Sequence, residues 1–459
     1  MKTNSIKSHF SYSGIKTLAL VGIMAFGSSC EDFVTVPLGG GKIGEEVVFS
    51  SDATAESAML GVYSATYNNA SYSILYPMFM ADELEGSATN SYVILQQNAY
   101  DETQSGWFLQ VYYNTIYCAN TVIEGCAAST QMSDAKKKQF TGEALFMRAY
   151  CHFLLANLYG EVPLVTMSDV RVSSMLPNTS MDKLYEAIIT DLKDAYNLVS
   201  ENYPSTEKVR VNKAACTAML ARAYLYNGDW TLAESEATKV ISSGAYQLVS
   251  DLTQIFKVGS SEIIWQQWMN GGYLPSTSSL IPSSTTSTAW WALSVLVNAI
   301  ENGDGRKAAW LALNGDGRYY HCKYKNRSTT TGTAMEYNVQ LRLGEMYLIR
   351  AEARAHQDKI IGSNSAASDL DMIRSRAGLL GTDATTRPAM LTAIEHERRI
   401  EMMAEPFHRW FDLKRTGRAI PVLGALKSQT WHDRAVLLPF PISMLNANIY
   451  LKQNDGYDH

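Results

Sequence analysis

Apolar residues recur at helical spacing over much of the chain, and this periodicity constrains the fold more than any other feature of the sequence. A segment that keeps the spacing over ten or more residues favours a helix that buries one face. We expect such helices at 53–68, 106–126, 133–159, 180–200, 212–227, 231–242, 339–356, 365–377 and 387–403. The sequence therefore predicts a mostly α-helical protein with little β structure.

One predicted helix pair, at 212–249, has the residue pattern of a tetratricopeptide unit. Small residues let two antiparallel helices approach closely, aromatic residues fill the remaining space, and a glycine permits the tight turn. The residues of this pattern are Ala221, Ala223, Tyr224, Asn227, Gly228, Asp229, Trp230, Ala233 and Ala237. Weaker pairs at 133–200 and 339–377 predict a tetratricopeptide-like framework of stacked helices.

Two long stretches break the helical pattern. Residues 259–289 are rich in Ser, Thr, Gly and Pro, and residues 314–332 are mostly polar. Long loops inside a compact fold are usually functional. The repeated sequence NGDGR, at 302–306 and 314–318, lacks the alternating acids and final Glu of a calcium loop, so we interpret both copies as turns.

The first 29 residues have the layout of a secretory signal peptide. Three lysines and no acid precede and accompany an apolar run at 15–26, and the small residues Gly27, Ser28 and Ser29 follow. The run is too short for a stable membrane span. Small residues leading directly to Cys30 resemble the lipid-attachment motif of bacterial lipoproteins, although Gly27 stands where Leu is usual. Cys30 is the predicted lipid anchor, and 30–44, with three consecutive glycines, is a predicted flexible tether.

Charge excludes nucleic acid as the main partner. Once residues 1–29 are removed, 36 Lys and Arg face 45 Asp and Glu, a net charge of about −9. No basic field is available to condense on phosphates.

Cysteine and histidine spacing gives no sign of a metal site or a disulfide framework. Beyond Cys30 the chain has Cys118, Cys126, Cys151, Cys216 and Cys322, with no two-residue spacing between any pair. Cys118, Cys151 and Cys216 lie in apolar helical patterns and are expected to pack as small hydrophobic residues. The segment around His396 lacks the second His of a helical zinc site. We expect no metal and no cofactor.

Five segments, in order along the chain, resemble the SusD/RagB family. They lie at 107–120, 143–165, 341–355, 394–417 and 438–457, and include the Leu-Tyr-Gly-x-Val-Pro-Leu turn, an Arg-Trp-x-Asp-Leu run and a final Gln-Asn-x-Gly-Tyr. Gly344 and Pro406 depart from the family pattern. Glu31 and Asp32 after Cys30 resemble the export signal of surface lipoproteins in Bacteroidetes.

The resemblance implies a lipid-anchored, nutrient-binding protein on the cell surface, at the outer membrane, with a SusD-like fold. Such proteins bind nutrients, commonly glycans, for TonB-dependent (SusC-like) transporters. The family motifs are structural, so the resemblance names no ligand-binding residue. We expect one SusD-like body at 45–459, with helix pairs at about 45–250, a loop-rich insert at about 259–332 and a C-terminal part at about 333–459.

A group of carboxylates at 397–405 raises the possibility of an enzyme. Glu397, Glu401 and Glu405 stand four residues apart, so they share one helix face. Arg398, Arg399 and Arg409 lie close by, and carboxylates paired with Arg make poor general acids. We interpret the group as a structural ion-pair network and expect no catalytic residue.

Aromatic residues beside polar ones are the better functional candidates. A sugar presents a face of C–H groups within a rim of hydroxyls, so an exposed ring can stack on it without any reaction. Adjacent aromatic residues cannot easily both point inward, and two of them follow a long Ser/Thr tract. The candidate ligand-binding residues are Trp290, Trp291, Tyr273, Trp268, Tyr72 and Tyr76, the last four in expected loops.

Four functions remain open. The favoured one is capture of an oligosaccharide or polysaccharide by aromatic stacking and its delivery to a TonB-dependent transporter. The alternatives are a helical-repeat scaffold that binds only protein, or a lipoprotein that binds peptide. A glycan-cleaving surface enzyme of the same fold is the least favoured.

Overall fold

The computed structural model describes residues 44–67 and 70–457. It divides the chain into two units, Met1–Val48 and Phe49–His459. In the first unit only residues 44–48 are described, with the short helix α2 (Glu45–Val48). The predicted signal segment 1–29, Cys30 and nearly all of the tether 30–44 lie outside the described residues.

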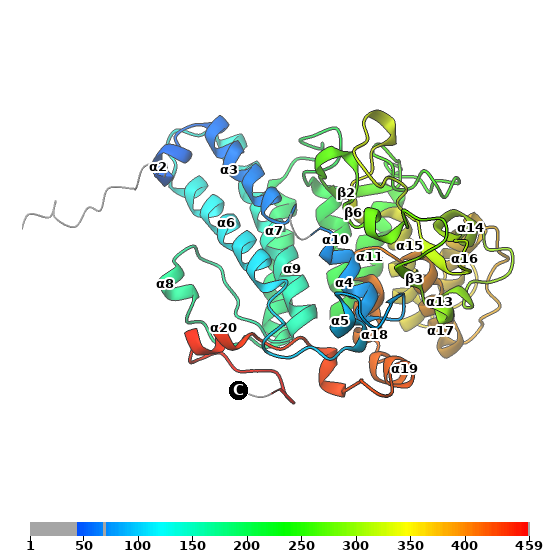
Figure 1. The fold of residues 1–459 in the computed structure, drawn as a ribbon. Coiled ribbons are helices and arrows are strands. Elements are labelled where there is room, and N and C mark those ends of the chain that lie inside the picture. The colour runs from blue at the N-terminus through cyan, green and yellow to red at the C-terminus, as the bar shows by residue number, and fades with distance from the viewer. Residues whose placement is uncertain (1–43, 68–69, 458–459) are drawn as a thin grey trace, which may run out of the picture. The chain divides into compact units, whose positions relative to one another are not determined.

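Helices dominate the second unit, which confirms the predicted fold class (Figure 1). Among the described residues, no helix is both long and apolar enough to cross a membrane. The helices are α3 (Asp52–Ala65), α4 (Tyr72–Met80), α5 (Val93–Gln97), α6 (Leu109–Ala128), α7 (Asp134–Tyr159), α8 (Val170–Ser173), α9 (Met181–Leu198), α10 (Lys213–Asn227), α11 (Trp230–Ser242), α12 (Thr277–Leu280), α13 (Ser294–Val297), α14 (Gly305–Trp310), α15 (Leu343–His356), α16 (Ala366–Arg376), α17 (Arg387–Glu401), α18 (His408–Arg415), α19 (Ala419–Leu426) and α20 (Ile442–Ala447). Short 3₁₀ turns η3 (Asn270–Gly272), η4 (Gly332–Ala334) and η5 (Asp433–Val436) add to them.

The long helices stack in chain order. Helix α6 packs on α7, α7 on α9, α9 on α10, α10 on α11, α11 on α15 and α15 on α16. This succession is the predicted tetratricopeptide-like framework. In the best-matching pair, α10 and α11, Gly228 ends α10 in the left-handed conformation (φ 81°), and Ala221 and Ala233 are fully buried. The turn and the small residues therefore do what the sequence pattern predicts.

Helix ends follow local capping rules. The side chains of Ser51, Ser133, Asn212 and Thr386 each accept a hydrogen bond from a backbone N–H in the first turn of the following helix. Cys151 and Cys216 are fully buried, as expected for packing residues, and Cys118 is half-buried.

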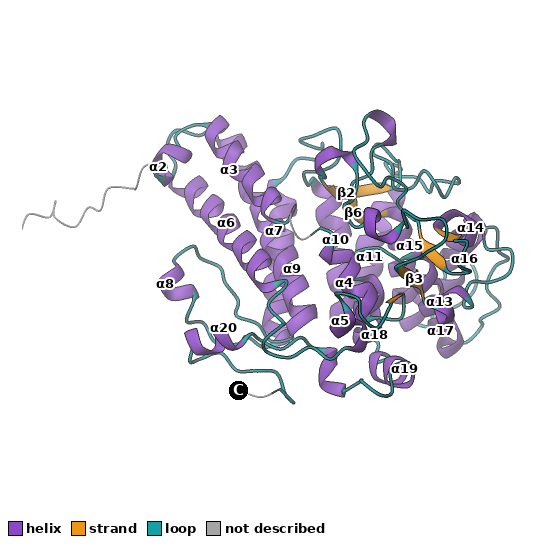
Figure 2. Cartoon of the chain, in the orientation of Figure 1, coloured by secondary structure: helices purple, strands orange, loops and turns teal. Residues whose placement is uncertain are grey.

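Short strands form three two-stranded antiparallel ribbons in the described residues (Figure 2). They are β1 (Leu84–Gly86) with β3 (Trp290–Ala292), β2 (Ile263–Gln267) with β6 (Asn338–Arg342), and β4 (Leu311–Leu313) with β5 (Tyr319–His321). The predicted helix at 339–356 is wrong at its start, because Val339 to Arg342 belong to β6. Polar Asn338, Gln340 and Arg342 alternate there with Val339 and Leu341, which is the two-residue period of a strand.

Helix α4 also differs from the sequence prediction. Tyr72 and Tyr76 were expected in loops, but both lie on this helix. Every residue of α4 except Tyr72 is buried, so no polar face marks it as an amphipathic helix. Its core position explains why the periodicity did not reveal it.

Buried arginines connect the ribbons to the C-terminal helices. The Arg342 guanidinium, at the end of β6, contacts Glu262 Oε1 and Glu401 Oε1 at 2.8 Å each, and Glu405 Oε1 at 2.7 Å. Lys323 Nζ lies 2.6 Å from Glu405 Oε1. Burial opposes the ionisation of Glu401, but Arg376, Arg342 and Arg306 together outweigh burial and lower its pKa. The carboxylate therefore stays charged although no solvent reaches it.

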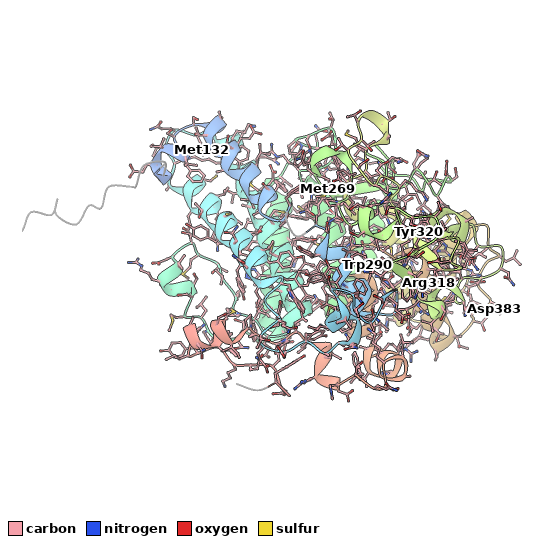
Figure 3. The ribbon with its side chains drawn as sticks, in the orientation of Figure 1. Met132, Met269, Trp290, Arg318, Tyr320 and Asp383 are labelled. Carbon is pink, nitrogen blue, oxygen red and sulfur yellow. The ribbon has the colours of Figure 1, made fainter. Side chains whose placement is uncertain are left out.

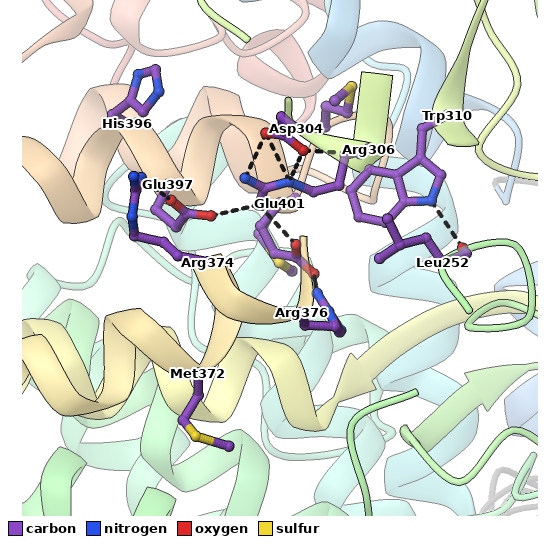
Figure 4. A network of polar contacts seen from close by, with 12 residues as sticks. Leu252, Asp304, Arg306, Trp310, Met372, Arg374, Arg376, His396, Glu397 and Glu401 are labelled. Atoms are coloured by element: carbon purple, nitrogen blue, oxygen red, sulfur yellow. Dashed lines mark hydrogen bonds and ion pairs between the residues drawn. The ribbon is translucent and has the colours of Figure 1, made fainter. Parts of the chain in front are cut away.

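Figure 4 shows the neighbouring part of this network. Arg306, at the start of α14, contacts Asp304 at 2.8 Å, Glu397 at 2.5 Å and Glu401 at 3.1 Å. Arg374 Nη1 contacts Glu397 at 3.2 Å from α16. Asp304 and Arg306 come from the first NGDGR sequence, whose Asp304 caps α14. The expected ion-pair network around Glu397, Glu401 and Glu405 is thus present and buried.

We expect Glu401→Gln to lower the free energy of unfolding by about 3–5 kcal/mol, because it leaves buried guanidinium groups without their charge partner. Urea unfolding followed by circular dichroism measures the difference. Asp358→Asn is the matched control: it removes one partner of an exposed ion pair with Arg387 and should cost less than about 1 kcal/mol. Equal effects of the two substitutions would contradict a special role for the buried network.

Candidate functional site

Six aromatic rings from four separate segments form one group, which we name the aromatic cluster. The ring centroids of Tyr72 and Tyr76 lie 4.9 Å apart, those of Tyr76 and Tyr92 5.5 Å apart, and those of Tyr92 and Trp290 5.2 Å apart. The angles between these ring planes lie between 42° and 65°, so the rings meet in tilted or edge-to-face contacts. The members are Tyr72, Tyr76, Phe79, Tyr92, Trp107 and Trp290.

Helix α4 supplies one side of the cluster. Tyr72 and Tyr76 stand four residues apart and so share a helix face, and Phe79 follows at three. Tyr72 is 40% exposed and Tyr76 only 8%. Tyr76 and Phe79 therefore form a buried base, while Tyr72, Tyr92, Trp107 and Trp290 keep part of their surface open.

The β1–β3 ribbon supplies the other side. It pairs Gly86 with Trp290, and a Cβ atom on residue 86 would lie 2.8 Å from Cδ1 of the Trp290 ring. Only glycine leaves room for the ring in this position. Gln96 Oε1 accepts hydrogen bonds from Gly86 N and from Asn90 Nδ2, each at 3.0 Å, and so holds the segment between β1 and α5.

A half-buried lysine, Lys427, connects the ends of α4 and α5. Lys427 Nζ donates to the carbonyl oxygens of Phe79 and Met80, both at 2.9 Å, and to Asn98 Oδ1 at 2.6 Å. Asn98 Nδ2 in turn donates to Met80 O. Burial lowers the pKa of Lys427 to about 7, while the charges of Asp82 and Glu85 favour its protonated form. The end of α4 is thereby fixed against the end of α5.

Trp291 lies on the opposite face of β3 from Trp290, as alternation along a strand requires. Its indole Nε1 donates to Glu85 Oε2 at 3.2 Å. The Arg318 guanidinium carbon lies 3.8 Å from the ring centroid. One face of the Trp291 ring is therefore covered by a cation instead of being open for stacking.

Trp268 and Tyr273 lie outside the cluster as their described contacts define it. Trp268, 48% exposed, has its ring 6.0 Å from that of Tyr67. These two rings, with Leu60, Tyr63 and Trp265, line a groove of about 310 Å³. Tyr273 is half-buried beside Gly271. Because Tyr67 and Tyr72 are five residues apart, their Cα atoms are at most about 18 Å apart.

A larger cleft of about 580 Å³ lies between α11, α15, α17 and α18. The rings of Trp230 and His356 stack in it at 3.8 Å. Its charged side chains mostly pair with one another, as Arg415 does with Glu352 and Asp412. Within the described part of the chain, no group of three or more His, Cys, Asp or Glu could hold a metal ion.

The sequence named three members of the cluster and missed three. Trp290, Tyr72 and Tyr76 were expected as separate candidates, and the fold brings them together. Tyr92 sits beside Asn and Ser in the sequence and could have been found by the rule that selected Tyr72. Trp107 was assigned to the core, and Phe79 has no sequence signal because it lies in an apolar run.

This site has the character of a binding surface. Partly open rings stand over a rigid aromatic base, and the carboxylates at 397–405 are buried in ion pairs away from solvent. The fold and the site together define a helical-repeat protein with a partly exposed aromatic cluster.

Comparison with known proteins identifies the family. A family described as "Starch-binding associating with outer membrane" matches residues 44–225, and the SusD family matches residues 313–457. The chain belongs to the SusD/RagB family. SusD-like protein P25 of Formosa agariphila is 23% identical, over 93% of this chain and 96% of that protein.

Solved structures share the fold. A laminarin-binding SusD-like protein superposes with a TM-score of 0.74 at 22% identity, covering 88% of this chain and 99% of that one. The surface glycan-binding protein A from Bacteroides thetaiotaomicron superposes with a TM-score of 0.74 at 21% identity, covering 89% and 99%. In this chain Arg148, from the second of the five motif segments, donates to Asp191 Oδ1 at 2.7 Å and to Asn120 Oδ1 at 2.8 Å, and so connects α7 to α9 and α6.

Glu83, just before β1, has a raised pKa that makes the stability of the protein depend on pH. Burial and the neighbouring Asp82 raise the pKa of Glu83 to about 8. The Glu83 backbone oxygen accepts from His321 Nε2 and from Leu293 N, so the residue anchors the root of the β1–β3 ribbon. Its carboxyl Oε1 has no hydrogen-bond partner among the described residues.

We expect Glu83→Gln to stabilise the protein increasingly as the pH rises from 5 to 8. A raised pKa in the folded state means that the neutral carboxyl contributes stability below pH 4.5, which is lost as the pH rises towards 8. Glutamine never ionises, so its advantage should reach up to about 4 kcal/mol at pH 8. Urea unfolding at pH 5, 6.5 and 8 measures it. The exposed Glu161→Gln is the control, and a pH-independent difference for Glu83→Gln would contradict the argument.

Proposed function

We propose that this protein binds a glycan at the aromatic cluster without cleaving it. The observation that carries the proposal is the row of partly open rings, Tyr72, Tyr92 and Trp290, fixed on a buried aromatic base. Such rings stack on the C–H faces of sugars, and a base that is already ordered keeps the entropic cost of binding low. Membership of the SusD/RagB family supports the proposal, as do the names of the laminarin-binding and surface glycan-binding structures.

The groove beside Trp268 extends the proposed surface. Trp268 and Tyr67 present a second open pair of rings, and the chain between Tyr67 and Tyr72 limits their distance from the cluster. A glycan of several sugar units is therefore a better fit than a single sugar. Tyr273 remains a candidate without a described contact to either ring group.

The wider biological role is part of the same proposal. Cys30 would carry the lipid that anchors the protein at the outer membrane, facing outwards. A TonB-dependent, SusC-like transporter would receive the glycan. The family description "associating with outer membrane" supports the location, and the sequence at 1–32 supports the lipid and the export.

We expect Trp290→Ala and Tyr72→Ala each to weaken glycan binding by about tenfold, or about 1.4 kcal/mol per ring. Isothermal titration of the protein starting at residue 31 against a panel of oligosaccharides and polysaccharides measures the change. Tyr450→Ala is the matched control, because Tyr450 is an exposed aromatic residue without a ring contact among those described.

Gly86→Ala gives a second test of the same site. Its Cβ would displace the Trp290 ring and so weaken binding while all the rings remain, whereas Gly61→Ala, with open space around it, should have no effect. Binding of no sugar by the native protein would refute the proposal and favour a peptide cargo or a protein-only scaffold. Glycan binding unaffected by Trp290→Ala would place the site elsewhere.

We expect the full-length protein, extracted from native membranes in mild detergent, to co-purify with a large TonB-dependent receptor. Cys30→Ala should be lost from the membrane fraction, because it removes the lipid attachment point. Mass spectrometry of the purified complex identifies the receptor and the lipid. Recovery of the protein alone under several mild detergents would count against delivery to a transporter.

A further inference from the structure

The second NGDGR sequence forms the turn between β4 and β5. Asn314 N donates to Arg318 O at 2.9 Å, and Gly317, with φ 79°, donates its N–H to Asn314 O. This turn is not part of the aromatic cluster. The turn positions the side chain of Arg318.

Hydrogen bonds connect this turn to the Ser/Thr segment that precedes Trp290. Asn314 Nδ2 donates to Ser284 O and Thr288 Oγ1, and Gly315 N donates to Thr285 O at 3.0 Å. A Cβ on residue 315 would lie 2.5 Å from Thr285 O, so only glycine permits this approach. Asp316 accepts from both N and Oγ1 of Thr288, at 2.7 and 3.0 Å. Two irregular loops thus form one braced support.

Arg318 lies on this support with its guanidinium over the Trp291 ring, 3.8 Å from the centroid, and is exposed. Arg318 is labelled in Figure 3. Its Nη1 also lies 3.4 Å from Thr288 O. An Arg stacked on a ring loses less freedom on binding than a free surface Arg, because its plane is already oriented. The remaining N–H donors face solvent.

Arg318 has no carboxylate partner within ion-pair distance, unlike most arginines in the described part of the chain. Of the arginines in the described part of the chain, all but Arg318, Arg327 and Arg434 have a carboxylate within ion-pair distance. The two carboxylates nearest in the ribbon and turn are already engaged. Glu85 accepts the Trp291 indole N–H, and Asp316 accepts three donors from Thr288 and Arg318 N. Arg318 is an oriented cation: Nη1 donates to Thr288 O, and among the described residues Nε and Nη2 have no hydrogen-bond partner.

We propose that Arg318 receives an anionic substituent, a carboxylate or a sulfate, on the glycan that stacks at Trp290. The inference rests on the proposed function and names the ligand class of that site. Trp290 and Trp291 are adjacent on β3, and their rings lie on opposite faces of the strand. In the proposed complex one sugar unit stacks on Trp290. A following unit extends past the edge of the ribbon and contacts Arg318. A planar guanidinium pairs with two oxygens of either anion.

Contact, not long-range attraction, supplies this selectivity. The chain has a net charge of −6, and Glu85 and Asp316 offset the field of Arg318 and the nearby Lys307. A polyanion is therefore not drawn in from a distance. The preference arises at short range, where the charge-assisted bonds form.

Matched oligosaccharides test the proposal. Oligogalacturonides are compared with their carboxyl-reduced counterparts, and sulfated carrageenan oligosaccharides with their desulfated forms, at equal length. We expect the native protein to bind at least one anionic form about tenfold more tightly than its neutral partner. The pair that shows the preference distinguishes carboxylate from sulfate.

Variants assign the preference to one side chain. Arg318→Met should abolish the preference for the anionic form and leave the affinity for the neutral partner unchanged. Arg318→Lys should keep only part of the preference, because lysine lacks the planar guanidinium that pairs with two oxygens at once. Arg327→Met, an exposed arginine also without an ion pair, is the matched control and should change nothing. An anionic preference that survives Arg318→Met, or a native preference for neutral forms, would overturn the inference.

The two proposals fail in different ways. If Trp290→Ala abolishes binding but Arg318→Met changes no preference, the glycan site stands and only the anionic ligand class is refuted. If the native protein binds none of these sugars and no other glycan, both proposals fall.

Discussion

The buried pairing of Arg342 with Glu262, Glu401 and Glu405 joins a β ribbon to the C-terminal helices. Charges without solvent are tolerated only when every partner is in place, so this network fixes the end of the β2–β6 ribbon against the end of α17. Gly344 belongs to the same arrangement. A Cβ there would lie 2.3 Å from Arg342 Nη1 and 2.8 Å from Glu262 Oε1, which gives a reason for glycine where the family tends to have alanine.

The aromatic cluster is rigid for a related reason: its supports come from distant parts of the chain. Helix α4 is held at its end by Lys427, and β3 is held by Gly86 and by the root of β1 at Glu83. None of these supports is a stacking residue. The arrangement of these rings therefore depends on polar contacts and on a close backbone approach outside the cluster.

Local patterns predicted the helical framework well. The α10–α11 pair follows from small residues, one glycine and helical spacing, all of which act within forty residues. The same reasoning failed for α4, which is buried on nearly all sides, and for Asn338–Arg342, whose two-residue alternation adjoins a helix. Local patterns also predicted that Glu397, Glu401 and Glu405 pair with arginines. The arginines that suggested this pairing are sequence neighbours of the carboxylates. The partners in the structure, Arg306, Arg342 and Arg376, come from other segments.

Periodicity, capping and turn chemistry act between near neighbours, so local patterns in the chain were enough to predict the helices and the stacked framework. Motif resemblance indicated the family, and polar neighbours indicated a short set of candidate rings. How those rings are grouped depends on the tertiary packing. It joined Trp290 to Tyr72 and Tyr76 through Tyr92, placed Trp268 with Tyr67, and covered one face of Trp291 with Arg318. Contacts between residues some two hundred positions apart depend on how helices and ribbons pack, and no local pattern in the chain records that packing.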